Sequence, residues 1–295
     1  MAGAGVLLVD KPGGVTSHDV VARARRALGT RKIGHAGTLD PMATGLLILG
    51  VEGATRLLTF IVGLDKTYEA TIRLGVATDS DDADGEITAT TDASHVTPSA
   101  IASGVEALTG HISQVPSTVS AIKVGGRRAY DLARAGEQVE LRARDVEVSR
   151  FDVLAERWGD GFVDLDVVVD CSSGTYIRAL ARDLGAALGV GGHLTALRRT
   201  RIGPFRVADA AMLDDLHTAT PIDPATAAAA VLGRLDVSAD EARDLRHGKR
   251  LAGAAARLAS SRAAAIDPDG RLVGIVERRG DDIKSAMNMP EEALP

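Results

Sequence analysis

One carboxylate in a tight loop is the residue of this chain best placed to do chemistry. Asp40 lies in the run Gly-His-Ala-Gly-Thr-Leu-Asp-Pro-Met-Ala-Thr-Gly at residues 34–45, where glycines and a proline frame a single acid. The apolar run at residues 46–49 follows at once, and a short apolar run bounded by glycine predicts a buried strand. Loops on a rigid scaffold often carry catalytic side chains, but Asp-Pro is also a common turn former. The loop alone leaves both roles open for Asp40.

A second motif places a tyrosine and an arginine two residues apart. Residues 171–178 read Cys-Ser-Ser-Gly-Thr-Tyr-Ile-Arg and follow a predicted strand. At the end of a strand, Tyr176 and Arg178 can therefore face one pocket. Burial alone would raise the pKa of an aspartate, whereas an adjacent arginine lowers it by roughly 1–3 units. We therefore expect Arg178 to be the partner of Asp40.

The loop at residues 34–45 resembles the catalytic loop of the TruB-type tRNA pseudouridine synthases. Further segments resemble motifs of that family in the same order along the chain, namely residues 11–17, 66–68, 79–85, 171–178 and 193–203. The resemblance implies an α+β fold with a mixed, largely antiparallel sheet in the catalytic domain. It also implies a small, β-rich, PUA-like RNA-binding module at the C-terminus.

The resemblance also implies a reaction. Enzymes of this family break the glycosidic bond of the T-loop uridine at tRNA position 55, after flipping the base, and rejoin the uracil through its carbon 5. The isomerisation needs no redox change and no energy input, so we expect no cofactor and no metal. The expected partner is the T-loop and T-stem of tRNA, the expected state is a monomer, and no membrane contact is expected.

The resemblance gives catalytic roles to Asp40, Tyr68 and Arg178. Asp40 acts as nucleophile or as base at the ribose, and both routes stay open. The tyrosine offers the uracil a flat face and a phenol for proton transfer. Four more residues are expected to bind the substrate: His35, which inserts into the stack that the flipped uridine leaves; Tyr176 and Leu197, which pack the base; and Asp82, which joins the hydrogen bonds of the site.

Basic residues supply candidates for phosphate contact. Gly-Gly before two arginines predicts a basic hairpin or loop, and in the family the corresponding insertion, residues 115–145, folds over the RNA. The candidates are Lys123, Arg127, Arg128, Arg198 and Arg199. Solvated surface charge explains the hairpin residues equally well.

The expected domains are a catalytic domain at 1–212, a connector at 213–231 and the PUA-like module at 232–292. Residues 11–17 are expected to support the Asp40 loop without chemistry of their own. The patterns predict strands at 5–9, 46–50, 66–74, 144–154 and 161–171, and helices at 17–28 (capped by Ser17), 52–62, from Thr97 towards Gly110, and up to Leu188. Residues 209–230 predict a helix followed by a connecting stretch.

Charge is segregated along the chain. The net charge is −6, yet residues 11–35 hold six basic residues against one acid, and residues 171–206 hold six arginines against one acid. Local basic faces of this kind favour RNA phosphates even on an acidic protein. The single Cys171 excludes an internal disulfide, and no apolar run is long enough for a membrane span, so we expect a cytoplasmic protein.

Other site types fit the sequence poorly. Residues 79–85 lack the ligand pattern of a calcium loop, and the glycines at 189–192 follow a helix without dinucleotide-loop spacing. Two rival functions remain: an RNA-binding folding helper, and a glycoside hydrolase pairing Asp40 with an acid from residues 79–86. The helper predicts RNA binding without turnover, and the hydrolase predicts release of free base or sugar.

Overall fold

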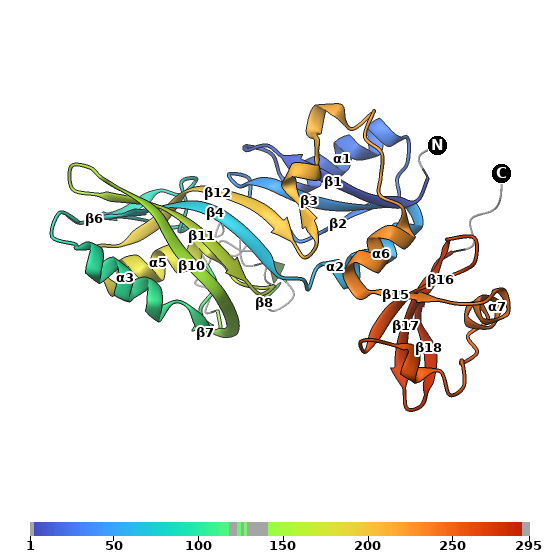
Figure 1. The fold of residues 1–295 in the computed structure, drawn as a ribbon. Coiled ribbons are helices and arrows are strands. Elements are labelled where there is room, and N and C mark those ends of the chain that lie inside the picture. Colours follow the sequence, from blue (N-terminus) through green and yellow to red (C-terminus); the bar gives the residue numbers. More distant parts are fainter. Residues whose placement is uncertain (1–2, 118–122, 125–126, 129–140, 291–295) are drawn as a thin grey trace. The chain divides into compact units, whose positions relative to one another are not determined.

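The computed structural model describes residues 3–117, 123–124, 127–128 and 141–290. Two compact units are present, the first from residues 1–41, 45–63 and 203–295 and the second from residues 42–44 and 64–202. Figure 1 shows the elements of both units. Across the described ranges, no helix is both long and apolar enough to cross a membrane.

The N-terminal part of the first unit is a small sheet beside one amphipathic helix. Its strand order is β14-β1-β3-β2, antiparallel except for the β1–β14 pair. The elements are β1 (Gly5–Lys11), α1 (Ser17–Leu28), β2 (Ile33–Ala36), β3 (Thr44–Val51), a 3-10 turn (Glu52–Leu57), α2 (Leu58–Ile61), β13 (Phe205–Arg206), β14 (Ala211–Met212) and α6 (Pro224–Leu232). Val20, Val21 and Ala24 of α1 pack on Leu47 and Leu49 of β3 in one buried cluster.

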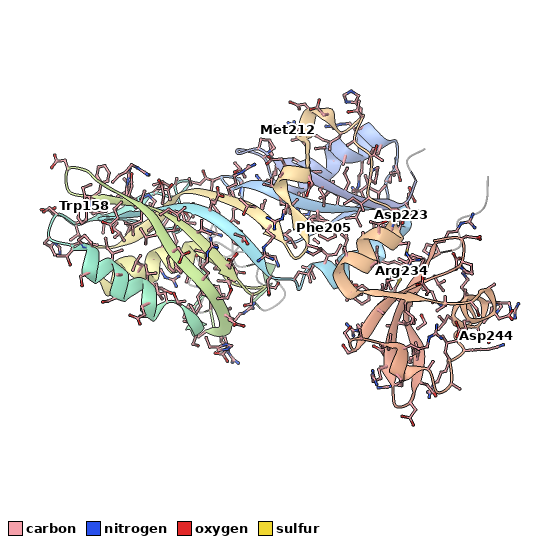
Figure 2. All side chains as sticks on the ribbon, in the orientation of Figure 1. Trp158, Phe205, Met212, Asp223, Arg234 and Asp244 are labelled. Carbon is pink, nitrogen blue, oxygen red and sulfur yellow. The ribbon has the colours of Figure 1, made fainter. Side chains whose placement is uncertain are left out.

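The C-terminal part of this unit is a separate four-stranded sheet with its own core. The strand order is β15-β16-β17-β18, from β15 (Arg234–Asp236), β16 (Arg262–Ile266), β17 (Leu272–Arg279) and β18 (Asp282–Asn288), with α7 (Ala239–Arg246) beside it. Leu245, Val273 and Ile283 lie in its core. Asp223, labelled in Figure 2, caps the preceding α6 by accepting hydrogen bonds from the Ala225 and Thr226 amides.

The second unit is an antiparallel sheet with the strand order β12-β4-β11-β10-β7. These strands are β4 (Lys66–Leu74), β7 (Gly110–Gln114), β10 (Arg144–Trp158), β11 (Val163–Cys171) and β12 (Gly192–Ile202). The other elements are β5 (Val76–Thr78), β6 (Ile87–Thr90), α3 (Pro98–Ala107), α5 (Ile177–Ala187) and the hairpin β8 (Lys123–Val124) and β9 (Arg127–Arg128). The helices α3 and α5 are in contact, and Gly104 leaves room there for the Leu184 side chain. Trp158 remains 47% exposed at the end of β10 (Figure 2).

The expected α+β class with a mixed, largely antiparallel sheet is confirmed, and so are most of the predicted elements. Thr16 caps α1 in place of Ser17, because the Ser17 hydroxyl is bonded to Leu39 instead. Helix α3 ends at Ala107, and Gly110 begins β7. Within residues 209–230 the α-helix comes last and not first: α6 begins at Pro224, directly after its N-cap Asp223.

Candidate active site

The backbone on both sides of Asp40 is held by residues 11–17. The Ser17 hydroxyl accepts the Leu39 N–H at 2.9 Å and donates to the Leu39 carbonyl at 3.1 Å. The Pro41 carbonyl accepts hydrogen bonds from the Gly14 N–H at 2.9 Å and from Lys11 Nζ at 3.2 Å. Ser17 and Lys11 are buried, whereas Asp40 is half-buried. The expectation that residues 11–17 support this loop is therefore confirmed.

His35 lies on β2, five residues before Asp40, opposite Leu49 of β3. Its ring stands edge-on to the ring of His18, with the ring centroids 5.5 Å apart. No motif or spacing pointed to His18, which follows Ser17 at the start of α1. The half-buried His35 ring and the exposed His18 ring therefore lie in the same unit as the Asp40 loop.

Tyr68 and Leu197 share one face of the second unit's sheet. Tyr68 of β4 is paired with Arg199 of β12, and Leu197 is paired with Ala70. Residues directly opposite in an antiparallel pair point to the same side, so these four side chains share one face. Tyr68 and Leu197 are each 8% exposed. Arg199 is 1% exposed, so we keep Arg198, which is half-buried, as the phosphate candidate of this strand.

Arg178 is paired with Asp82 inside the second unit. Arg178 Nη1 lies 3.3 Å from Asp82 Oδ2, with the two side chains 5% and 6% exposed, and also donates to the Ser80 carbonyl at 2.8 Å. The Ser80 hydroxyl and the Asp84 N–H donate to Asp82 Oδ1 at 2.6 and 3.1 Å. Asp82 is thus held by Arg178, Ser80 and Asp84, and its expected part in the hydrogen bonds of the active site stays a prediction. The expected Arg178–Asp40 pair stays a prediction.

Two neighbouring charged residues went unnoticed in the sequence. Asp81 has φ of +61° and lies 3.3 Å from Arg182 Nη1, through its Oδ2. Burial raises the pKa of Asp81 even though the Arg182 cation opposes the shift. A left-handed backbone at an aspartate is uncommon and needs support from its surroundings. No periodicity or motif signals such a position in advance.

Lys66 and Cys171 are neighbours on the Tyr68 face. They are paired across β4 and β11, and both are buried. Burial, reinforced by the nearby Arg199 cation, lowers the pKa of Lys66 to about 8. Burial raises the pKa of the Cys171 thiol to about 11. Burial on the face that holds Tyr68 therefore favours the neutral forms of both Lys66 and Cys171.

A cavity of about 450 Å³ lies within the second unit. Among the predicted site residues, Leu197 and Arg198 line it, with Thr44, Glu69 and Asp166. Arg198 Nη1 donates to Thr44 Oγ1 at 3.4 Å. In the part of the chain that the structure describes, no cluster of three or more His, Cys, Asp or Glu side chains could hold a metal.

The predicted basic hairpin exists as backbone pairing. Lys123 pairs with Arg128, and Val124 pairs with Arg127, as β8 and β9. The rest of the predicted insertion between 118 and 140 lies outside the described residues. The phosphate contacts of Lys123, Arg127 and Arg128 stay predictions.

Comparison with known proteins covers the whole chain. Residues 25–177 match the TruB family pseudouridylate synthase N-terminal domain, residues 178–235 the tRNA pseudouridylate synthase B C-terminal domain, and residues 232–290 the tRNA pseudouridine synthase II C-terminal domain. The chain is 56% identical to tRNA pseudouridine synthase B of Leifsonia xyli, over 100% of this chain and 99% of that one. It is 59% identical to the protein of the same name from Nocardia farcinica, over 94% and 90%.

A solved Cbf5-Nop10-Gar1 complex contains a chain of similar fold. The TM-score is 0.68 at 25% identity, covering 98% of this chain and 84% of the other. Both relatives are more than 50% identical to this chain over at least 94% of its length, and the family domains match from residue 25 to residue 290. The chain belongs to the TruB family of pseudouridine synthases and is an isomerase that makes pseudouridine in tRNA.

Proposed function

We propose that this enzyme isomerises the T-loop uridine at tRNA position 55, with Asp40 starting the reaction. The observation that carries the proposal is the hold on Asp40: Lys11 and Ser17 fix the peptide groups on both sides of it. Preorganised side chains are what a reaction at a flipped base requires, because misplacement by about 1 Å can cost a factor on the order of 100 in rate.

The chemistry assigns each residue one task. Asp40, as nucleophile or base at the ribose, promotes cleavage of the bond between ribose carbon 1′ and uracil N1. Carbon 5 then bonds to carbon 1′, and the proton on carbon 5 is lost while N1 gains one, so the mass is unchanged. Tyr68 supplies the phenol beside the base, and Tyr176 and Leu197 pack it. Arg178, held by Asp82, keeps the Asp40 carboxylate ionised.

Three further parts of the proposal concern RNA. His35 fills the space that the flipped uridine leaves, while Lys123, Arg127, Arg128 and Arg198 contact phosphates. The 115–145 insertion closes over the T-loop and T-stem, and the PUA-like sheet at 232–292 contributes a second RNA surface beyond the connector at 213–231. The enzyme works as a monomer without a guide RNA, and its cytoplasmic location stays a prediction.

A mapping experiment tests this specificity. An unmodified tRNA transcript is incubated with the purified enzyme alone, and pseudouridines are mapped by carbodiimide adducts that stop reverse transcription. A single stop at position 55 supports the proposal. A stop elsewhere, or a stop that appears only when a guide RNA is added, contradicts it, and free uracil in the supernatant would favour the hydrolase interpretation.

A further inference from the structure

The chain enters the 115–145 insertion through two residues that are both bonded to the α5 region. Gln114 ends β7 and is 2% exposed. Its Oε1 accepts the Tyr176 N–H at 2.9 Å, and its Nε2 donates to the Tyr176 carbonyl at 3.1 Å. The carbonyl of the next residue, Val115, accepts a hydrogen bond from Arg182 Nη2 at 2.7 Å. The root of the insertion is thereby fixed to the start and the middle of one helix.

The start of the same helix carries two residues of the proposed site. Tyr176 is the N-cap of α5 and has no side-chain cap hydrogen bond of its own, and Arg178 follows in the first turn. Arg178 holds Asp82, while Arg182 holds the adjacent Asp81 at 3.3 Å. The insertion root, the start of α5 and the 81–82 loop therefore form one connected set of hydrogen bonds and ion pairs.

A buried glutamine at this position has a specific use. Burying an amide is unfavourable unless both its donor and its acceptor find partners. The Gln114 amide offers one acceptor and one donor to a single residue, so it fixes the orientation of the Tyr176 backbone on both sides. The direction of the Tyr176 Cα–Cβ bond, from which its ring extends, follows from that orientation. An apolar residue would fill the same space without setting it.

We propose that Gln114 is a positioning residue for the active site. It sets the orientation of the Tyr176 backbone and of the start of α5, and thereby holds Tyr176 and Arg178 in place. This inference rests on the roles proposed above for those two residues. Gln114 itself touches neither the substrate nor the reacting atoms.

The test uses Gln114→Leu in the full-length enzyme, with Ser113→Ala, an exposed neighbour on β7, as the matched control. The single-turnover rate at saturating tRNA is expected to fall by roughly 10–100-fold, with Kd for tRNA changed by less than about 3-fold. Gln114→Glu keeps the acceptor for the Tyr176 N–H and loses the donor, so its single-turnover rate should lie between the rates of wild type and Gln114→Leu. It also serves as the test if Gln114→Leu fails to fold. A single-turnover rate within about twofold of wild type in the folded variant overturns the inference.

A double-mutant cycle separates positioning from a general structural defect. In a Tyr176→Ala background, the fold-reduction in rate caused by Gln114→Leu should be at least about threefold smaller than in wild type, because the side chain that Gln114 orients is gone. An undiminished penalty overturns the inference. The proposed function fails separately: Tyr176→Ala and Arg178→Lys would then turn over at the wild-type rate, whatever Gln114→Leu does.

Discussion

The ammonium group of Lys11 donates a 3.2 Å hydrogen bond to the carbonyl of Pro41, the residue that follows Asp40. Lys11 also donates to the carbonyls of Pro12 and Val15 at 2.9 and 2.7 Å, so one buried cation ties the residue 11–17 segment to the loop. A buried cation surrounded by carbonyl oxygens holds its geometry well, because leaving those groups unpaired would be costly. The backbone beside Asp40 is thus held by a segment that begins 30 residues before Pro41 in the chain.

Removing the Ser17 hydroxyl should loosen the Asp40 loop. Ser17→Ala deletes both hydrogen bonds to Leu39 in a buried site, and we expect a loss of about 1–3 kcal/mol in the free energy of unfolding. Turnover should fall by about tenfold, because Asp40 loses its fixed position. Denaturant unfolding and single-turnover assays check this. Ser99→Ala, on the exposed face of α3, is the control; wild-type activity in Ser17→Ala would contradict the account.

Breaking the buried Arg178–Asp82 pair should greatly lower the free energy of unfolding. Asp82→Asn leaves a cation with 5% of its side chain exposed beside a neutral amide, and we expect a loss of about 3–5 kcal/mol in unfolding free energy. Asp164→Asn is the control, because its partner Arg73 is 34% exposed and such pairs contribute about 0–1 kcal/mol. Urea titrations compare the two variants. Equal losses would mean that Arg178 is not held by Asp82.

The Lys66 and Cys171 pair should give stability an unusual pH dependence. The folded pKa of Lys66, about 8, lies below its ordinary value of 10.5, so the unfolded chain binds more protons between these values and stability rises with pH. The folded pKa of Cys171, about 11, lies above its ordinary 9.0, so stability falls with pH between those values.

Only Lys66 acts between pH 8 and 9, and the two effects oppose each other above pH 9. Unfolding free energies measured from pH 7 to 10 should therefore rise more from pH 8 to 9 in wild type than in Lys66→Met. Cys171→Ala should continue to gain stability above pH 9, where wild type levels off. Parallel curves of unfolding free energy against pH for wild type and Lys66→Met would show that folding does not change the pKa of Lys66.

The amino-acid sequence was sufficient for the Asp40 loop, the strand that follows it and β4, because each has strong glycine punctuation or clear alternation. It failed at β2, β7 and β12, which the patterns did not predict as strands. In β12 the charged residues 198, 199 and 201 break the alternation, and two register shifts in its pairing with β4 disturb it further.

The partners of the site residues were also beyond pattern reasoning. Arg178 was expected beside Asp40, a pair that stays a prediction, whereas the ion pair seen in the structure is with Asp82, in a loop whose backbone is left-handed at Asp81. The double hydrogen bond of Gln114 to Tyr176 links residues 62 apart in sequence. Such contacts depend on long-range packing, which no local period encodes.

The basic hairpin should contribute to RNA binding through charge. Changing Lys123, Arg127 and Arg128 together to alanine should weaken tRNA binding and reduce the slope of log K against log salt by about one for each lost phosphate contact. Filter binding at several salt concentrations measures the slope. An unchanged slope would return these residues to ordinary solvated surface charge.

The central claim is that Asp40 performs the isomerisation, and tritium release tests it most directly. A tRNA transcript labelled at uracil carbon 5 loses tritium to water when carbon 5 forms the new glycosidic bond. Wild type should release one equivalent from the T-loop uridine, and Asp40→Asn should bind the same tRNA with similar affinity and release none. Tritium release by Asp40→Asn at a rate near wild type would contradict the account.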